Sequence, residues 1–323
     1  MQKSGRRILA LTAALAVCMV ISLQIQPILD WLVLRSYTPS PSIASFVERT
    51  AMTQKATRLL YVNKPVLDGR AAFNQHCPNG TEQSVVLGCY LGNRQGIFIY
   101  NVTDHQLDGV REVTTAHEML HQAYDRLSRG ERHRIDGLLQ QQLTTITDET
   151  LKQQIEQYKK TEPDAINTEL HSLLGTQTKT LSPELEGYYK QYFTDRSKVV
   201  GLYDAYRSAF TSRKLQIDAY DAQLKALKPA IESLQQSLER QLGSLDTTKS
   251  QMDRLRSAGD IAGFNSLVGP YNAKATAYNA DLEVLKQKIT EYNTIVNQRN
   301  AIADQEQALQ QSLSSKSLPG TVE

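Results

Sequence analysis

Two histidines four residues apart, with a glutamate directly after the first, are the residues best spaced to do chemistry in this chain. They are His117, Glu118 and His121 in the segment TTAHEMLHQAYDRL. Residues four apart lie on one face of a helix, so both imidazoles can bind one metal ion. Two neutral imidazoles supply two of the three protein ligands of a catalytic zinc, and the adjacent carboxylate can accept a proton from zinc-bound water. The alternative is a helix with two core histidines and a surface glutamate.

The helix that must hold these residues has start and stop signals in the sequence. Its apolar positions recur with helical period and His117 shares their stripe, so both histidines are predicted to face the interior. These positions are Val113, Leu120, Tyr124 and Leu127. Asp108-Gly109 predicts the start of the helix and Gly130 its end. Ahead of it, the β-rich segments SVVLGCYL and GIFIYNV predict strands.

A third ligand must come from another segment, and DAINTELHSLLGT offers Glu169 and His171. The apolar residues Ile166, Leu170 and Leu174 predict a helix that packs inward. Two residues two positions apart point about 200° apart on a helix, so at most one of them can reach the metal. Periodicity does not choose between them.

The HExxH pattern resembles the zincin metallopeptidases, and it is matched by His117, Glu118 and His121. The arrangement is similar to that of gluzincins, whose third ligand is a glutamate on a downstream helix. This maps onto Glu169, with His171 in reserve. The likeness covers roughly residues 84–193, and it departs from the pattern at Leu173, where several gluzincins carry an aspartate.

The resemblance implies an α+β fold: a mainly helical zincin-like catalytic domain with a small β-sheet whose edge strand follows the substrate cleft. It also implies hydrolysis of a peptide bond in a protein or peptide substrate, with one catalytic zinc and Glu118 as the general base. The longer metzincin pattern is excluded, because Tyr124 and Leu127 occupy its glycine and histidine positions.

Other polar residues near these segments are weaker candidates for a role in catalysis or in orienting a metal ligand. A hydroxyl of Tyr188, Tyr189 or Tyr192 could donate to an oxyanion, although a tyrosine cluster is more often packing. Asp125, one turn beyond His121, could orient a metal ligand or lie on a solvated helix face.

The three cysteines indicate in which cellular compartment the chain is expected to lie. Cys18 lies in the apolar amino-terminal run, whereas Cys77 and Cys89 are separated by a Pro-Asn-Gly turn, so a disulfide is geometrically easy. A disulfide would indicate an oxidising compartment. Two free thiols or a second metal site are the alternatives.

Residues 1–35 predict a cytoplasmic basic tip and a transmembrane signal anchor. Lys3, Arg6 and Arg7 precede an apolar run from Ile8 that continues, with interruptions, through Leu34. The chain is therefore expected to cross the cell membrane once, with its remainder outside the cytoplasm. A cleaved signal peptide is the alternative. Residues 36–42 predict an exposed linker, and residues 43–195 the catalytic domain.

From residue 196 to 312 the composition predicts two long helices in an antiparallel coiled-coil hairpin, followed by a disordered tail, residues 313–323. Pro229 is expected to kink the first helix or to mark its restart, and the break between the helices is expected to extend from Ser257 to Pro270. The expected apolar stripes comprise Leu224, Leu227, Ile231, Leu234, Leu238, Leu242, Leu245, Met252 and Leu255 in one helix, and Tyr271, Tyr278, Leu282, Leu285, Ile289, Tyr292 and Val296 in the other. Such an arm could bind a partner or a second copy, or act as a spacer.

The whole chain has 323 residues and a formal net charge of +2, with its basic residues spread, which argues against nucleic acid as a partner. Two hypotheses follow. The first is a membrane-anchored zinc peptidase, and the second is a non-enzymatic envelope adaptor that acts through its helical arm.

Overall fold

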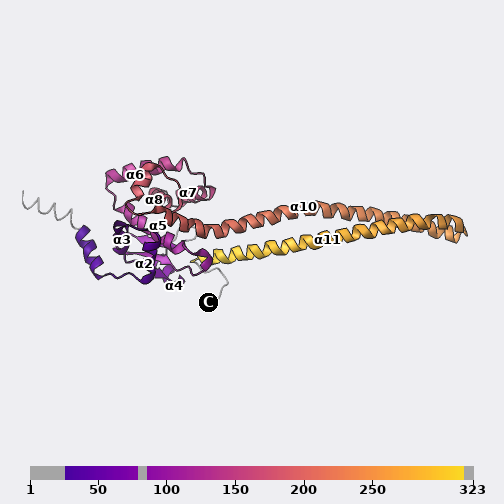
Figure 1. The fold of residues 1–323 in the computed structure, drawn as a ribbon, viewed down its shortest axis with the longest axis horizontal. Helices are drawn as coiled ribbons and strands as arrows, with labels where there is room; N and C mark the ends of the chain where they lie inside the picture. The colour runs from indigo at the N-terminus through magenta and orange to yellow at the C-terminus, as the bar shows by residue number, and fades with distance from the viewer. Residues whose placement is uncertain (1–25, 79–85, 316–323) are drawn as a thin grey trace, which may run out of the picture. The chain divides into compact units, whose positions relative to one another are not determined.

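The computed structural model describes residues 26–78 and 86–315. The described residues are mainly helical with one three-stranded sheet, in agreement with the expected α+β class (Figure 1). They form two compact units, one ending at Ala209 and resuming at Leu309, and the other comprising Phe210–Ala308. Two helices, α10 (Arg196–Ser257) and α11 (Ile261–Leu313), contribute residues to both units.

The sheet of the first unit contains β1 (Val66–Asp68), β2 (Gly88–Leu91) and β3 (Gly96–Tyr100) in the order β1-β3-β2. β3 pairs in parallel with β1 and antiparallel with β2. Among the strands of the described residues, β2 therefore lies at an edge of the sheet. The sequence predicts β2 and β3, whereas β1 is too short for its alternation to be recognised.

The two faces of the sheet are covered by different helices. Ile97 and Ile99 of β3 are fully buried in the main core, which they share with α5 (Val110–Asp125). The alternate residues of β3 point to the opposite face, because successive side chains in a strand alternate. There Phe98 and Tyr100 contact the rings of His76 and Phe73 on α4 (Arg70–His76).

Helix α5 begins where Asp108-Gly109 predicts. Gly109 has a φ of 96°, which glycine adopts more readily than other residues. A Cβ at this position would also lie 3.0 Å from the carbonyl oxygen of Leu202, so both the backbone conformation and the available space favour glycine. Arg49 forms ion pairs with Asp108 and with the buried Glu112. The start of the helix is therefore fixed from two sides.

The predicted end of this helix at Gly130 is wrong. α5 ends at Asp125, and a new helix, α6 (Arg129–Leu143), contains Gly130. Its N-cap, Ser128, forms a capping box with Glu131. Because this box satisfies backbone N–H groups at a new helix start, it overrides the stop that the glycine suggests.

The remaining helices of the first unit pack against α5 or against its neighbours. They are α2 (Pro41–Arg49), α3 (Gln54–Tyr61), α7 (Glu149–Thr161), α8 (Ile166–Gln177) and α9 (Pro183–Tyr189), with 3₁₀ helices η1 (His105–Leu107) and η2 (Pro163–Ala165). α8 packs against α5 through the fully buried Leu170, Leu173 and Leu174.

The amino-terminal segment differs from the expected linker. Pro41 and Ser42 belong to α2, which is capped by Ser40, and the Tyr37 hydroxyl donates to the carbonyl oxygen of Pro65 at 3.3 Å. Most of the expected transmembrane segment, and Cys18, lie outside the described residues; residues 26–36 are helical. Within the described ranges, no helix combines the length and apolar character needed to cross a bilayer.

The beginning of α10 and the end of α11 belong to the first unit. Val199, Val200 and Tyr203 of α10 lie in its core, and Leu309 of α11 is 1% exposed. The expectation of a disordered tail from residue 313 is wrong at its start, because Ser315 is buried and its carbonyl oxygen accepts a hydrogen bond from Asn74 at 2.7 Å. Residues 316–323 lie outside the described part of the chain.

In the second unit, α10 and α11 run antiparallel side by side (Figure 1). Hydrogen bonds join Gln241 to Asp281, Thr248 to Lys274, and Asp221 to Arg299. Partner residues therefore have lower numbers in α11 as the residue number in α10 rises, which is the register of an antiparallel pair. The expected stripe positions Leu238, Leu245 and Leu285 are buried between the helices, but Leu242 and Ile289 are exposed.

The connection between these helices is shorter than predicted. α10 continues through Pro229 and ends at Ser257, and α11 begins at Ile261 and contains Pro270. A proline removes one backbone hydrogen bond from a helix. Both helices nevertheless continue on either side of their proline, so this local loss does not end either helix.

Candidate metal centre

The structure brings His117, His121 and Glu169 together in the first unit. The two imidazole rings, one turn apart on α5, are edge to face with centroids 4.7 Å apart. Nε2 of His117 lies 3.5 Å from Oε2 of Glu169 on α8, and Nε2 of His121 lies 3.4 Å from Oε1. Donor atoms of all three residues lie within 4.8 Å of one another.

These distances fit a shared metal ion better than hydrogen bonds. An N–H···O bond is about 2.9 Å long, whereas ligand atoms about 2 Å from a tetrahedral zinc lie about 3.3 Å apart. Oε2 of Glu169 is buried and has no hydrogen-bond partner among the described residues. Two imidazole nitrogens and one carboxylate are also a donor set that zinc accepts. The residues present therefore fit the ion.

Burial holds the histidines in the form that binds metal. It lowers the pKa of both His117 and His121 to about 4, so both imidazoles are neutral near pH 7. Burial also raises the pKa of Glu169. The neutral rings and the buried carboxylate would each gain from the positive charge of a bound cation.

The donors are oriented by neighbours that the sequence does not single out. Nδ1 of His121 lies 3.0 Å from Oγ1 of Thr168, which directly precedes Glu169 on α8. An Nδ1–H donated to this hydroxyl leaves the Nε2 lone pair directed at the metal position. Tyr158 of α7 forms a hydrogen bond with Glu169. Thr168, and not Asp125, thus holds the His121 ring.

Glu118 lines the same cleft as the three donors, and this cleft has a volume of about 710 Å3. The Glu118 side chain packs against Gly88 of β2: a Cβ on Gly88 would lie 2.7 Å from Oε1 of Glu118 and 2.6 Å from Cγ2 of Thr114. Only glycine leaves room for the carboxylate here. The edge strand therefore helps to fix the residue expected to act as the general base.

His171 lies apart from this cluster. It is fully buried, its Nε2 is 2.8 Å from the Tyr188 hydroxyl, and its ring contacts Tyr189 and Tyr192. Burial lowers its pKa to about 3. The tyrosines considered as oxyanion donors are thus packed around a core histidine and do not line the cleft.

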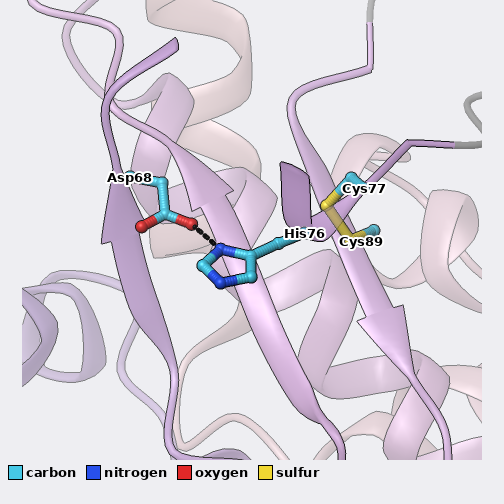
Figure 2. Close-up of a disulfide and its surroundings, with 4 residues drawn as sticks. All are labelled: Asp68, His76, Cys77 and Cys89. Carbon is cyan, nitrogen blue, oxygen red and sulfur yellow. Dashed lines mark hydrogen bonds and ion pairs between the residues drawn. A yellow bond between two sulfur atoms is a disulfide. The ribbon is translucent and has the colours of Figure 1, made fainter. Parts of the chain in front are cut away.

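β2 and the end of α4 also line the cleft. The Cys77–Cys89 disulfide, which the spacing favours, joins these two elements with its Cα atoms 6.2 Å apart (Figure 2). Both cysteines and the neighbouring His76 line the cleft.

Sequence reasoning missed Gly88, Thr168, Tyr158 and His76. The inward positions Leu151, Ile155 and Tyr158 of α7 follow helical spacing and are a signal for Tyr158. The other three act through contacts between distant segments, which spacing along the chain does not reveal. No protein-family model, curated protein or solved structure matches this chain.

Proposed function

We propose that this protein is a zinc-dependent peptidase with a zincin-like catalytic domain, in which His117, His121 and Glu169 hold the ion. The observation that carries the proposal is the contact of one carboxylate with two imidazole nitrogens at 3.4 and 3.5 Å, beside Glu118 in an open cleft. A zinc bound there would act as a Lewis acid and lower the pKa of a bound water.

The chain's own residues supply the rest of the chemistry. Glu118 is placed to take a proton from the attacking water and to pass it to the leaving amine, a role that suits a carboxylate in a partly desolvated cleft. β2 lines the cleft as an edge strand, so its peptide groups can pair with an extended substrate. A peptide is therefore the substrate class that this wall fits.

We also propose that the catalytic domain is anchored in the cell membrane and faces outward. The Cys77–Cys89 disulfide supports an oxidising compartment. The apolar run that begins at Ile8 behind Lys3, Arg6 and Arg7 supports a single-pass anchor.

An envelope adaptor that acts through α10 and α11 is the second candidate. It is favoured by large apolar side chains exposed along α10, among them Leu215 and Leu242. Such residues could meet a coiled-coil partner or a second copy.

Metal analysis and peptidase assays of protein comprising Tyr37–Glu323 test the first proposal. We expect equimolar zinc in the wild type and in Glu118→Gln, and loss of zinc in His117→Ala and Glu169→Ala. Glu118→Gln should lower kcat by a factor of about 100 or more, because the general base is removed.

His105→Ala is the matched control, because this histidine is 93% exposed and lies outside the cleft. It should retain both zinc and turnover. Full proteolysis by Glu118→Gln would reject the assignment of the base. Purified wild-type protein that takes up no zinc would favour the adaptor.

A further inference from the structure

His76 is a polar residue of the cleft to which the proposed chemistry gives no role. Its Nδ1 lies 2.7 Å from Oδ2 of Asp68 on β1 (Figure 2), and its ring stacks on Phe98 at 4.0 Å between centroids. The Asp68 side chain is 7% exposed, whereas that of His76 is 44% exposed. A buried carboxylate thus holds a ring whose remaining edge and face are open.

The hydrogen bond to Asp68 determines what the open edge presents. A carboxylate accepts, so Nδ1 of His76 carries the donated proton, and the uncharged tautomer that makes this bond has its lone pair on Nε2. The stacked Phe98 and the bond to Asp68 prevent the ring from turning. Nε2 is therefore a fixed acceptor on the cleft wall, suited to an N–H group of a ligand.

His76 and Glu118 lie on opposite faces of the sheet. Cys89 and Phe98 are paired in register, and Phe98 carries His76 on the α4 face, whereas Gly88, one residue away, faces Glu118 of α5. Both histidine and glutamate nevertheless line one cleft. The cleft therefore extends past the edge of β2 that pairs with no other described strand.

We propose that His76, positioned by Asp68, is a specificity-determining residue that accepts a hydrogen bond from a backbone N–H of an extended polypeptide, remote from the bond that is cleaved. This inference rests on the proposed peptidase function. Because His76 and Glu118 lie on opposite faces of the sheet, a peptide that contacts both must extend past β2, and contact with His76 therefore requires a longer peptide than contact with Glu118 alone. The substrates would then be extended protein segments and not dipeptides.

The test measures binding in the inactive Glu118→Gln protein, so that it does not depend on turnover. The probes are fluorescein-labelled alanine- and serine-rich peptides of about 4, 8 and 12 residues, which are roughly 13, 26 and 40 Å long when extended. Adding His76→Gln should weaken binding of the longer peptides about three- to tenfold, the value of one hydrogen bond, and leave the shortest peptide unaffected. His105→Gln, a histidine beside an aspartate outside the cleft, should change nothing.

Replacing His76 removes the partner of a buried carboxylate, so Asp68→Asn combined with His76→Gln serves as a second variant in which no charge is left unpaired. It should show the same length-dependent loss with normal zinc content. An unchanged affinity for every length in a folded, zinc-loaded variant would overturn the role of His76. Absent turnover in the wild type would instead count against the peptidase proposal, since binding is measured separately.

Discussion

Histidines in this chain differ in what surrounds them. His117 and His121 face a carboxylate across distances that suit a metal, His171 is enclosed by tyrosines, and His76 is held by Asp68 at the cleft wall. An imidazole can be a ligand, a core residue or a hydrogen-bond acceptor, and the neighbouring groups select among these roles. The candidate site is thus defined by contacts more than by residue types.

Gly88→Ala tests how tightly Glu118 is held. The added methyl would lie 2.7 Å from Oε1 of Glu118 and 2.6 Å from Cγ2 of Thr114, so the carboxylate must move. We expect kcat for peptide hydrolysis to fall about 10- to 100-fold while zinc content stays equimolar, because small displacements of catalytic groups have large effects. Steady-state kinetics measure kcat, and metal analysis measures the zinc content.

The matched control is Gly92→Ala, just beyond the same strand. A Cβ there would lie 3.9 Å from Oδ2 of Asp125, an ordinary contact, so activity should stay near the wild-type level. Equal loss of activity in both variants would show that the strand, and not the space for Glu118, is the sensitive feature.

How much of the site follows from sequence depends on the range of each contact. The helical pair His117 and His121 is recognisable because four residues make about one turn. The choice of Glu169 over His171 requires a family resemblance, since both border the same apolar stripe. The roles of Gly88 and Thr168 cannot be predicted from the sequence, because each depends on a contact with a residue of another segment.

At the scale of elements, local signals predict where helices start better than where they stop. Gly109 begins α5 as expected, whereas the stop expected at Gly130 is displaced by the Ser128 capping box. Pro270 likewise fails to break α11. Start signals add hydrogen bonds to orphan N–H groups, but a lone glycine or proline only weakens a helix, and tertiary packing offsets that loss.

The junction between α7 and α10 offers a test at this scale. Asp148 caps α7 by accepting from the backbone N–H groups of Thr150 and Leu151, and it forms an ion pair with Arg207 of α10. The side chain is 36% exposed, so solvent screens the pair and the cap dominates. We expect Asp148→Ala to lower the free energy of unfolding by about 1–2 kcal/mol, and Asp148→Asn by less, because asparagine can still cap.

The pH dependence of this effect has a definite sign. The hydrogen bond from Arg207 lowers the pKa of Asp148 to about 2, below its ordinary value of 3.8. Between these values the unfolded chain binds a proton that the folded carboxylate does not, so the stabilisation is complete above about pH 4 and is lost as the pH falls to about 2. Urea unfolding at several pH values should show the difference between wild type and Asp148→Asn vanishing near pH 2; a constant difference would contradict the ion-pair contribution.

For the whole molecule, the residues of the candidate site and most residues of the two long helices belong to different units. The three donors, Glu118 and His76 all belong to the first unit, whereas Phe210–Ala308 forms the second. The first unit also keeps the beginning of α10 and the end of α11, where Leu309 is buried. Shortening the second unit without cutting these ends therefore separates the chemistry from the arm.

The pairs Gln241–Asp281 and Thr248–Lys274 define a register in which residues 235–248 lie opposite residues 274–287. Removing both ranges deletes two heptads from each helix and leaves the remaining partners aligned. We expect zinc content and hydrolysis of short peptides to stay within about twofold of the wild type, since none of the deleted residues lines the cleft or belongs to the metal centre. Removing residues 235–248 alone should misalign the helices and lower the unfolding temperature of the second unit. If the balanced deletion abolished hydrolysis of short peptides, the site would depend on the arm; a selective loss of protein substrates would indicate that the arm presents them.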